Sequence, residues 1–157
     1  MDYTQIDTII EKNESMMHIE CTKESFLVLS KLIHDHYHQK GVSIIYHDEG
    51  KYEHLSIKSY LKFYFEIGKP KLSFDGILNQ LDLETHIRKK MNQLEPGLLK
   101  RVFIARSLCM GSEILLIEDP IENMDTKSAQ KIVGVLEWMF EQGIVVVSAS
   151  TSFRSVC

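Results

Sequence analysis

The sequence predicts an α/β domain with a mostly parallel sheet flanked by helices. Short apolar segments rich in β-branched residues alternate with segments whose apolar residues recur at spacings of three and four. One apolar run, Ile114–Ile117, is uninterrupted, as in strands covered on both faces. Because alternating strands and helices form parallel sheets with right-handed crossovers, we expect helices on both faces. The 157 residues suffice for one domain, residues 1–157, with a real core.

The first elements are a strand, a helix and a second strand. Met16–Cys21 is short and apolar, which predicts a strand. The helix that follows ends before Gly41, and its apolar face consists of Phe26, Leu29, Leu32 and Ile33. Val42–Tyr46 contains β-branched and aromatic residues and predicts the second strand, which leads into the polar segment His47–Gly50.

A helical insert is predicted at about residues 55–95. Its apolar residues follow a helical period that Gly68 and Pro70 interrupt. After the insert, the same patterns predict the remaining elements in order: a helix over Leu98–Leu108, the strand Ile114–Ile117, a helix around Ile132–Met139 and a strand at Ile144–Val147.

Composition excludes several classes of protein. With 18 Lys plus Arg against 22 Asp plus Glu, the net charge of −4 gives no basic surface for nucleic acid or an anionic membrane. The start lacks a signal peptide, and the run Ile144–Val147 is far too short to span a bilayer. The cysteines Cys21, Cys109 and Cys157 are odd in number and lack metal-type spacing, which indicates reduced thiols. We expect a cytoplasmic protein without membrane insertion.

Two motifs resemble the second half of an ABC-transporter ATPase domain. The first is the helical run Arg101–Leu108, which follows Glu95-Pro96-Gly97, and the second is Glu118-Asp119-Pro120 after the strand Ile114–Ile117. In that family a Ser-Gly-Gly signature opens a helix with an R-V-x-I-A-R-x-L run, and a hydrophobic strand ends in Asp-Glu-Pro. The resemblance covers roughly Gly41–Ser150. It implies a P-loop NTPase-like (ABC ATPase-like) fold.

The signature motif resembles the family in its scaffold more than in its phosphate contacts. In the family, the signature serine and glycines bind the γ-phosphate at a helix N-terminus. Glu95 occupies the serine position, where a carboxylate would repel phosphate, and Pro96 removes one amide. Glu95, Gly97 and Arg101 are therefore interpreted as remnants of the signature, without a cofactor-binding role.

The strand motif has its two acidic residues in reversed order. Family members carry an Asp that holds magnesium and then a Glu that polarises the attacking water. Here Glu118 precedes Asp119, which displaces each carboxylate by about one methylene, whereas near-attack geometry tolerates only about an ångström. We expect Walker B-like remnants without catalysis, although weak magnesium binding is conceivable. Asp125 resembles the aspartate of the D-loop.

Other nucleotide contacts of the family are missing from the sequence. Ala149 takes the expected position of the switch histidine, and Asp48 or Glu49 that of the Q-loop glutamine. A phosphate-binding loop needs a glycine-rich run, yet no glycine occurs between Met1 and Lys40. Lys23 and Ser25 could be remnants of the loop, or the segment is a plain turn in which Ser25 caps the helix. We expect neither bound ATP nor hydrolysis.

Two side-chain groups have alternative interpretations. His34 and His38 stand at i and i+4, the spacing of a metal-binding pair, although a solvated helix face explains them as well and no metal site is expected. The aromatic residues Tyr60 and Phe63–Phe65 fit helix packing, and in the ABC family this region contacts the permease.

These observations predict a non-catalytic ABC ATPase-like domain that acts as a regulatory or protein-interaction module. It resembles the N-terminal part of certain bacterial transcriptional regulators that end in a LytTR DNA-binding domain. The alternative is an ATP-binding subunit of an ABC transporter whose partner completes a composite site, and a third interpretation is a metal-dependent enzyme using His34 and His38. The expected partner is a permease, a sensor or a fused DNA-binding domain. A homodimer would need an apolar interface of its own.

Overall fold

The computed structural model describes residues 3–13, 15–47 and 54–151. The chain divides into two compact units, which are considered one at a time. The first unit comprises Met1–His47, Glu113–Pro120 and Leu136–Cys157, and the second comprises Asp48–Ser112 and Ile121–Val135. The single domain expected over residues 1–157 stays a prediction.

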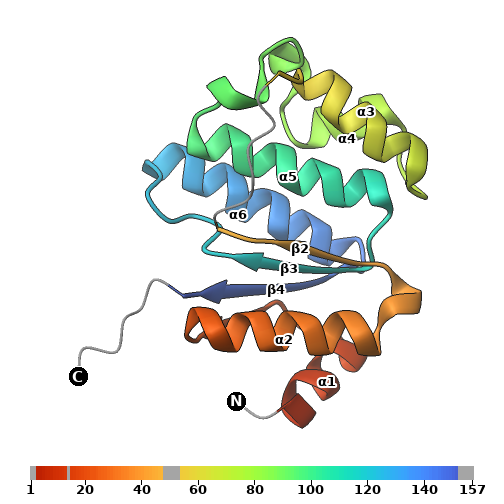
Figure 1. Cartoon of the computed structure of the whole chain (residues 1–157), viewed down its shortest axis with the longest axis vertical. Helices are drawn as coiled ribbons and strands as arrows, with labels where there is room; N and C mark the ends of the chain where they lie inside the picture. Colours follow the sequence, from red (N-terminus) through yellow and green to blue (C-terminus); the bar gives the residue numbers. More distant parts are fainter. Residues whose placement is uncertain (1–2, 14, 48–53, 152–157) are drawn as a thin grey trace. The chain divides into compact units, whose positions relative to one another are not determined.

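The first unit contains a four-stranded, fully parallel sheet in the order β1-β4-β3-β2. Its strands are β1 (Met17–Glu20), β2 (Val42–Ile45), β3 (Ile114–Glu118) and β4 (Val145–Ser150). Leu116 pairs with Ile44 on one side and with Val147 on the other, which makes β3 an inner strand. Every residue of β3 is buried, as its continuous apolar run predicts. The predicted mostly parallel α/β sheet is confirmed (Figure 1).

Helices α1 (Tyr3–Lys12) and α2 (Lys23–His36) cover one face of this sheet. Ile6 and Ile10 of α1, together with Phe26 and Ile33 of α2, pack in one core with the strand residues Ile19, Leu116 and Val147. Helix α1 was not predicted from the sequence, although Ile6 and Ile10 have the i, i+4 spacing of a helical face.

The start of α2 corrects the predicted cap. Thr22, not Ser25, is the N-cap residue, because Thr22 has extended backbone angles and its hydroxyl accepts a hydrogen bond from the Ser25 amide. Helix α2 ends at His36, and the short 3₁₀ helix η1 (His38–Lys40) and Gly41 lead into β2. Only Cys21 and Thr22 lie between β1 and α2. A loop that wraps a phosphate has no room there.

The second unit is helical. It contains α3 (Ile57–Ile67), α4 (Phe74–Gln80), the 3₁₀ helices η2 (Glu84–His86) and η3 (Met91–Gln93), α5 (Pro96–Met110) and the larger part of α6 (Thr126–Glu141). Helices α3 and α4 lie in the predicted insert, which Gly68 interrupts as expected. Helix α5 ends at Gly111, whose φ of 71° is left-handed and where a Cβ would lie 2.0 Å from the Lys69 carbonyl oxygen. Among the described residues, no helix has the length and apolar character needed to cross a bilayer.

Strand β4 is longer than predicted. The apolar pattern ends at Val147, but Ser148–Ser150 continue the strand because they pair with β1, and Ala149 also pairs with Glu118 of β3. Tertiary pairing therefore overrides the weak strand propensity of Ser and Ala. Ala149 lies inside the strand, and the residue that follows the strand is Thr151.

Candidate functional site

The polar side chains of the first unit gather where its parallel strands end. Glu118 is the last residue of β3, and Asp119 follows it directly. Lys23 begins α2 just after β1, His47 lies two residues beyond β2, and Thr151 follows β4. Ligands of open α/β sheets bind outside the carboxyl ends of the strands, so this edge is the candidate site.

Glu118 is fully buried and accepts hydrogen bonds from Lys23, His47 and Thr151. Its Oε1 accepts from Lys23 Nζ at 2.5 Å and from the His47 amide at 2.7 Å, and its Oε2 accepts from the Thr151 hydroxyl at 2.6 Å. Burial alone would raise the pKa of this carboxyl group, but the hydrogen bonds from Lys23, Thr151 and His47 together lower it. Glu118 is therefore a carboxylate at neutral pH.

Asp119 is fixed beside Glu118 by the same threonine. Its Oδ1 accepts from the Thr151 amide at 3.0 Å, and its Oδ2 lies 2.9 Å from the Thr151 hydroxyl. The hydroxyl has one proton, so the carboxylates of Glu118 and Asp119 share a single donor. Asp119 also adopts a φ of 48°, a left-handed conformation that costs a non-glycine residue about 1 kcal/mol or more. The two acidic side chains are held together at a local backbone cost.

Of the two possible remnants of a phosphate-binding loop, Lys23 and Ser25, only Lys23 contacts the acidic pair. Its side chain is 41% exposed, and its ammonium forms the ion pair with Glu118 and lies 5.4 Å from the centre of the Tyr46 ring. Ser25 instead belongs to the helix cap through Thr22. Because the ammonium already neutralises Glu118, a divalent cation would have to compete with it for that oxygen.

The signature-like residues lie in the second unit, at the start of α5. Glu95 is the N-cap residue with φ −64° and ψ 154°, but its side chain makes no capping hydrogen bond, and Pro96 is the first helical residue. Gly97 is buried, and a Cβ there would come within 2.9 Å of Ser128 Cβ. The glycine therefore serves close packing within this unit.

Arg101 and Asp125 have structural partners in the second unit. The buried Arg101 guanidinium donates to the carbonyl oxygens of Leu81 at 2.8 Å and Asp82 at 3.0 Å, which ties α5 to the insert. The carboxylate of Asp125 accepts from the Ser128 amide at 2.8 Å and caps α6. The Q-loop candidates Asp48 and Glu49, like Cys157, lie outside the described residues.

The histidine pair does not share a helix face. Helix α2 ends at His36, and His38 begins η1 after the cap residue Tyr37. His34 Nδ1 lies 3.5 Å from an Asp35 carboxylate oxygen, and His38 Nδ1 lies 3.0 Å from the Asp35 carbonyl oxygen. Among described residues, neither histidine belongs to a group of three metal-ligating side chains. The i, i+4 argument for a metal enzyme therefore loses its basis.

Sequence reasoning missed His47 and Thr151 as members of the site. His47 Nδ1 lies 4.0 Å from Asp119 Oδ2, in addition to the bond from its amide to Glu118. Both residues follow strand ends, which was the available signal. Thr151 was hidden because the predicted β4 stopped at Val147.

Searches for related proteins find ATP-binding proteins of transporters, while no family model matches the chain. The macrolide export ATP-binding/permease protein MacB of Hahella chejuensis is 38% identical over 71 residues, 45% of this chain and 11% of that protein. The phosphonates import ATP-binding protein PhnC 1 of Nostoc sp. is 32% identical over 102 residues, 64% of this chain and 38% of that protein. The zinc import ATP-binding protein ZnuC of Ehrlichia chaffeensis is 23% identical over 112 residues, 66% of this chain and 46% of that protein. The chain thus spans less than half the length of these relatives.

Solved structures of ABC transporter proteins share the fold. A structure described as an ABC transporter ATP-binding protein from Pyrococcus furiosus has a TM-score of 0.71 at 22% identity, over 93% of this chain and 82% of that one. A metal-chelate type ABC transporter in an inward-facing conformation has a TM-score of 0.67 at 15% identity, over 87% of this chain and 62% of that one. The fold is that of ABC ATPase domains, a P-loop NTPase fold.

These comparisons correct the predicted function. The interpretation as a regulatory module within a LytTR-type transcriptional regulator is wrong, because the similar proteins are ATP-binding components of transporters. The resemblance to ABC-transporter ATPase domains is confirmed, whereas the interpretation of the individual signature-like and Walker B-like residues stays a prediction. The alternative, an ATP-binding subunit of an ABC transporter, agrees better with the comparisons.

Proposed function

We propose that this chain is the ATP-binding subunit of an ABC transporter and uses a composite nucleotide site that a partner completes. The observation that carries the proposal is the interlocked group of Lys23, Glu118, Asp119 and Thr151 at the carboxyl edge of the parallel sheet. A lysine at the start of the helix after β1 and an acidic pair at the end of β3 are the charged parts that P-loop NTPases use for phosphate and magnesium.

The donor set suits magnesium and phosphate. Carboxylate and hydroxyl oxygens are the ligands that Mg²⁺ takes in proteins, and Glu118, Asp119 and Thr151 offer them side by side. The Lys23 ammonium could turn from Glu118 to a phosphate oxygen, since its side chain is partly exposed. The chain lacks the glycine-rich amides that would cradle the phosphates, and in this proposal the partner supplies them.

We propose that the chain by itself does not hydrolyse ATP. The order Glu118 then Asp119 displaces both carboxylates, and Thr151 and Lys23 already occupy their oxygens. The proposed role is binding at a cytoplasmic membrane-associated complex, with turnover left to a site that the partner forms.

The partner in this proposal is a membrane permease. Phe63 and Ile67 stand at i and i+4 on α3 and are 57% and 58% exposed, an apolar pair that water does not favour. The neighbouring ring of Tyr64 packs on Tyr60, so this helix is firmly anchored behind the exposed pair. Such a rigid, exposed apolar pair suits docking on another protein.

Photolabelling tests this function. The tagged chain would be exposed to a photoreactive ATP analogue with magnesium, alone and with membranes of the organism that encodes it. We expect strong labelling only with membranes and its loss in Lys23→Ala, whereas Lys31→Ala, an exposed lysine of α2, should label as the wild type does. Absence of labelling in both conditions, or labelling that Lys23→Ala leaves unchanged, would contradict the composite site.

A further inference from the structure

The ion pair between Lys23 and Glu118 places a positive charge on the carboxylate that a divalent cation would need. Lys23 Nζ lies 2.5 Å from Glu118 Oε1, and the lysine side chain is 41% exposed, whereas that of Glu118 is only 1% exposed. The lysine therefore leads from the buried carboxylate to the solvent. A cation that arrives from the solvent has to take this oxygen from the ammonium.

The other two donors described for Glu118 are held in place by the backbone. One is the main-chain amide of His47, 2.7 Å from Oε1. The other is the hydroxyl of Thr151, a residue whose amide also donates to Asp119 Oδ1 at 3.0 Å. The Lys23 ammonium, in contrast, stands at the end of a flexible four-carbon stem. Of these donors, the ammonium is the one that can leave without any movement of the backbone.

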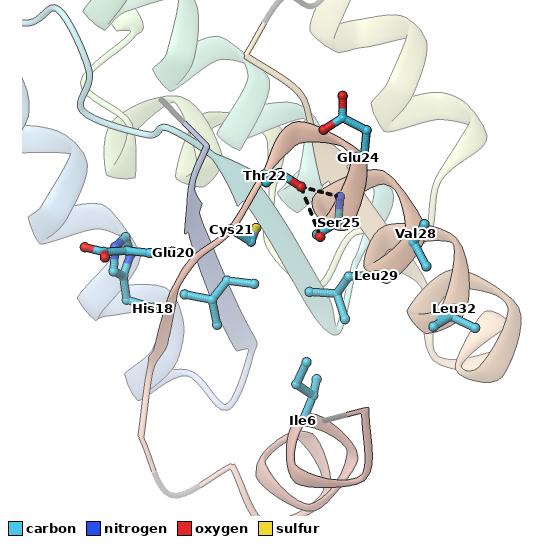
Figure 2. Close-up of a pocket in the computed structure, with 11 residues that line it drawn as sticks. Ile6, His18, Glu20, Cys21, Thr22, Glu24, Ser25, Val28, Leu29 and Leu32 are labelled. Carbon is cyan, nitrogen blue, oxygen red and sulfur yellow. Dashed lines mark hydrogen bonds between the residues drawn. The ribbon is translucent and has the colours of Figure 1, made fainter. Parts of the chain in front are cut away.

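The backbone from which Lys23 extends is itself anchored. Lys23 is the first residue of α2, and the Thr22 hydroxyl that caps this helix lies 3.1 Å from the Ser25 amide and 3.0 Å from the Ser25 hydroxyl, beside a pocket next to β1 (Figure 2). The ammonium also lies 5.4 Å from the centre of the Tyr46 ring, a cation–π contact. Because cap and ring are fixed, the ammonium returns to the same carboxylate oxygen whenever no ligand displaces it.

We propose that Lys23 is a built-in substitute for the divalent cation and that it blocks metal binding at Glu118 until an oxyanion draws it away. The inference rests on the proposed function in naming magnesium and phosphate as the two ligands. An oxyanion at Lys23 frees Glu118 for the metal, and a metal at Glu118 frees Lys23 for the oxyanion. Each ligand therefore raises the affinity for the other by the same factor, so the site takes the two together and disfavours either one alone.

Removal of the ammonium tests the block. Mn²⁺, which takes the same carboxylate ligands as Mg²⁺, would be titrated into the full chain without nucleotide, with free Mn²⁺ followed by electron paramagnetic resonance. We expect Lys23→Ala to bind one Mn²⁺ with a dissociation constant about tenfold or more below that of the wild type, because a charge-assisted hydrogen bond no longer competes. Lys23→Arg keeps the charge and should bind as weakly as the wild type. Lys31→Ala, which removes a lysine paired with Asp35 on the same helix, should do so too.

A double variant shows whether Glu118 is the group that Lys23 blocks. Lys23→Ala combined with Glu118→Gln should lose the gain in Mn²⁺ affinity. Thermal melts give a second readout, because Lys23→Ala leaves a buried carboxylate without its counter-ion. Saturating Mg²⁺ should raise the melting temperature of Lys23→Ala by about 3 °C or more and leave that of the double variant unchanged. If Lys23→Ala does not fold in either condition, Lys23→Gln replaces it, since its neutral amide still donates a hydrogen bond.

The predicted coupling has its own measurement. Sodium sulfate, an oxyanion salt that keeps Mn²⁺ in solution, would be compared with sodium chloride at equal ionic strength. Sulfate should lower the Mn²⁺ dissociation constant of the wild type by about fivefold or more and leave that of Lys23→Ala unchanged.

Three results would each overturn the proposal: equal Mn²⁺ affinity in the wild type and Lys23→Ala, an undiminished gain in the double variant, or a sulfate effect that persists without Lys23. These measurements use neither nucleotide nor membranes. Their failure would therefore be distinct from a failure of the composite nucleotide site, which the photolabelling tests.

Discussion

The end of β3 and the start of α5 carry the two halves of one family resemblance, yet their side chains behave in opposite ways. At the end of β3, both oxygens of the buried Glu118 accept hydrogen bonds, and Thr151 joins it to Asp119. At the start of α5, the exposed Glu95 makes no capping bond. The first region is held by interlocking polar contacts, whereas the second is defined by backbone shape and packing.

Burial explains this difference. A carboxylate without access to water must be paired or hydrogen-bonded, so folding itself depends on the partners of Glu118. Glu95 remains in contact with water and costs little whatever its neighbours are. A glutamate at position 95, where the family has a serine, is therefore compatible with an intact helix. A glutamate at the buried position 118 is stable only because Lys23 and Thr151 donate hydrogen bonds to it.

The largest expected effect comes from replacing Glu118 and Glu95 one at a time, which tests whether the two carboxylates differ in their contribution to stability. Glu118→Ala should lower the free energy of unfolding by about 2–4 kcal/mol, because three donors lose their acceptor and the side chain leaves a cavity. Glu95→Ala should change it by less than about 0.5 kcal/mol. Urea denaturation measures both, with the exposed Glu11→Ala as the control. Equal effects at the two positions would remove the distinction.

The second test concerns the hydrogen bonds by which Arg101 of α5 holds the insert. Arg101→Met keeps much of the side chain's bulk but leaves the carbonyl oxygens of Leu81 and Asp82 without their donor. We expect a loss of about 1–3 kcal/mol. Arg88→Met, at an exposed position of the same unit, is the control for loss of a positive charge. Chemical denaturation of both variants measures the difference, and similar losses would argue against the carbonyl contacts.

The pH dependence of stability should sharpen the contrast at β3. The folded-state pKa of Glu118 is lowered, so its contribution is fully present above the ordinary pKa of glutamate, about 4.3, and is lost as the pH falls through the lower folded value. Glu118→Gln should therefore make the decline in stability below about pH 4.5 shallower. Thermal melts between neutral and acid pH measure this slope. A slope identical to that of the wild type would mean that Glu118 does not titrate differently on folding.

The smallest expected effect is a gain at the start of α5. Glu95 has the extended backbone angles of an N-cap residue, so Glu95→Ser should add a capping bond and stabilise the chain by about 0.5–1 kcal/mol. Magnesium-ATP turnover should stay at background in Glu95→Ser and also when Pro96→Gly is added, because neither change creates a phosphate loop. Turnover by the double variant in a phosphate-release assay would show that the defect lies in the signature.

Periodicity was sufficient to predict the sheet, because parallel strands and their crossover helices have distinct apolar patterns. Ile114–Ile117 and the helix after Pro96 appear where the sequence places them. The end of β4 could not be predicted, because Ser148–Ser150 extend the strand only through their pairing with β1, whose sequence position is remote.

The sequence predicted the acidic pair of the candidate site, but it did not predict all the residues that donate hydrogen bonds to this pair. Glu118 and Asp119 stand out after an apolar strand, and Lys23 was considered as a remnant of a phosphate-binding loop, but nothing in the sequence indicates that Thr151 and His47 contact the acidic pair. Those residues meet the pair because all four strands end at the same edge. The function was misjudged because residues missing from the nucleotide contacts were given more weight than the retained scaffold, whereas the comparisons find ATP-binding proteins of transporters.

The pairing of β1 with β4 has a consequence for biosynthesis. His18 and Ser148 are 130 residues apart, so β1 leaves the ribosome long before β4, its neighbour among the described strands, exists. At about 5–20 residues per second, the wait is roughly 7–26 s, during which the apolar face of β1 has only the adjacent helices to cover it. Such a non-local parallel pairing also slows folding itself. The nascent chain should therefore be a good substrate for chaperones that bind exposed strands, and its yield should depend on them more than that of a domain whose first strands form a local hairpin.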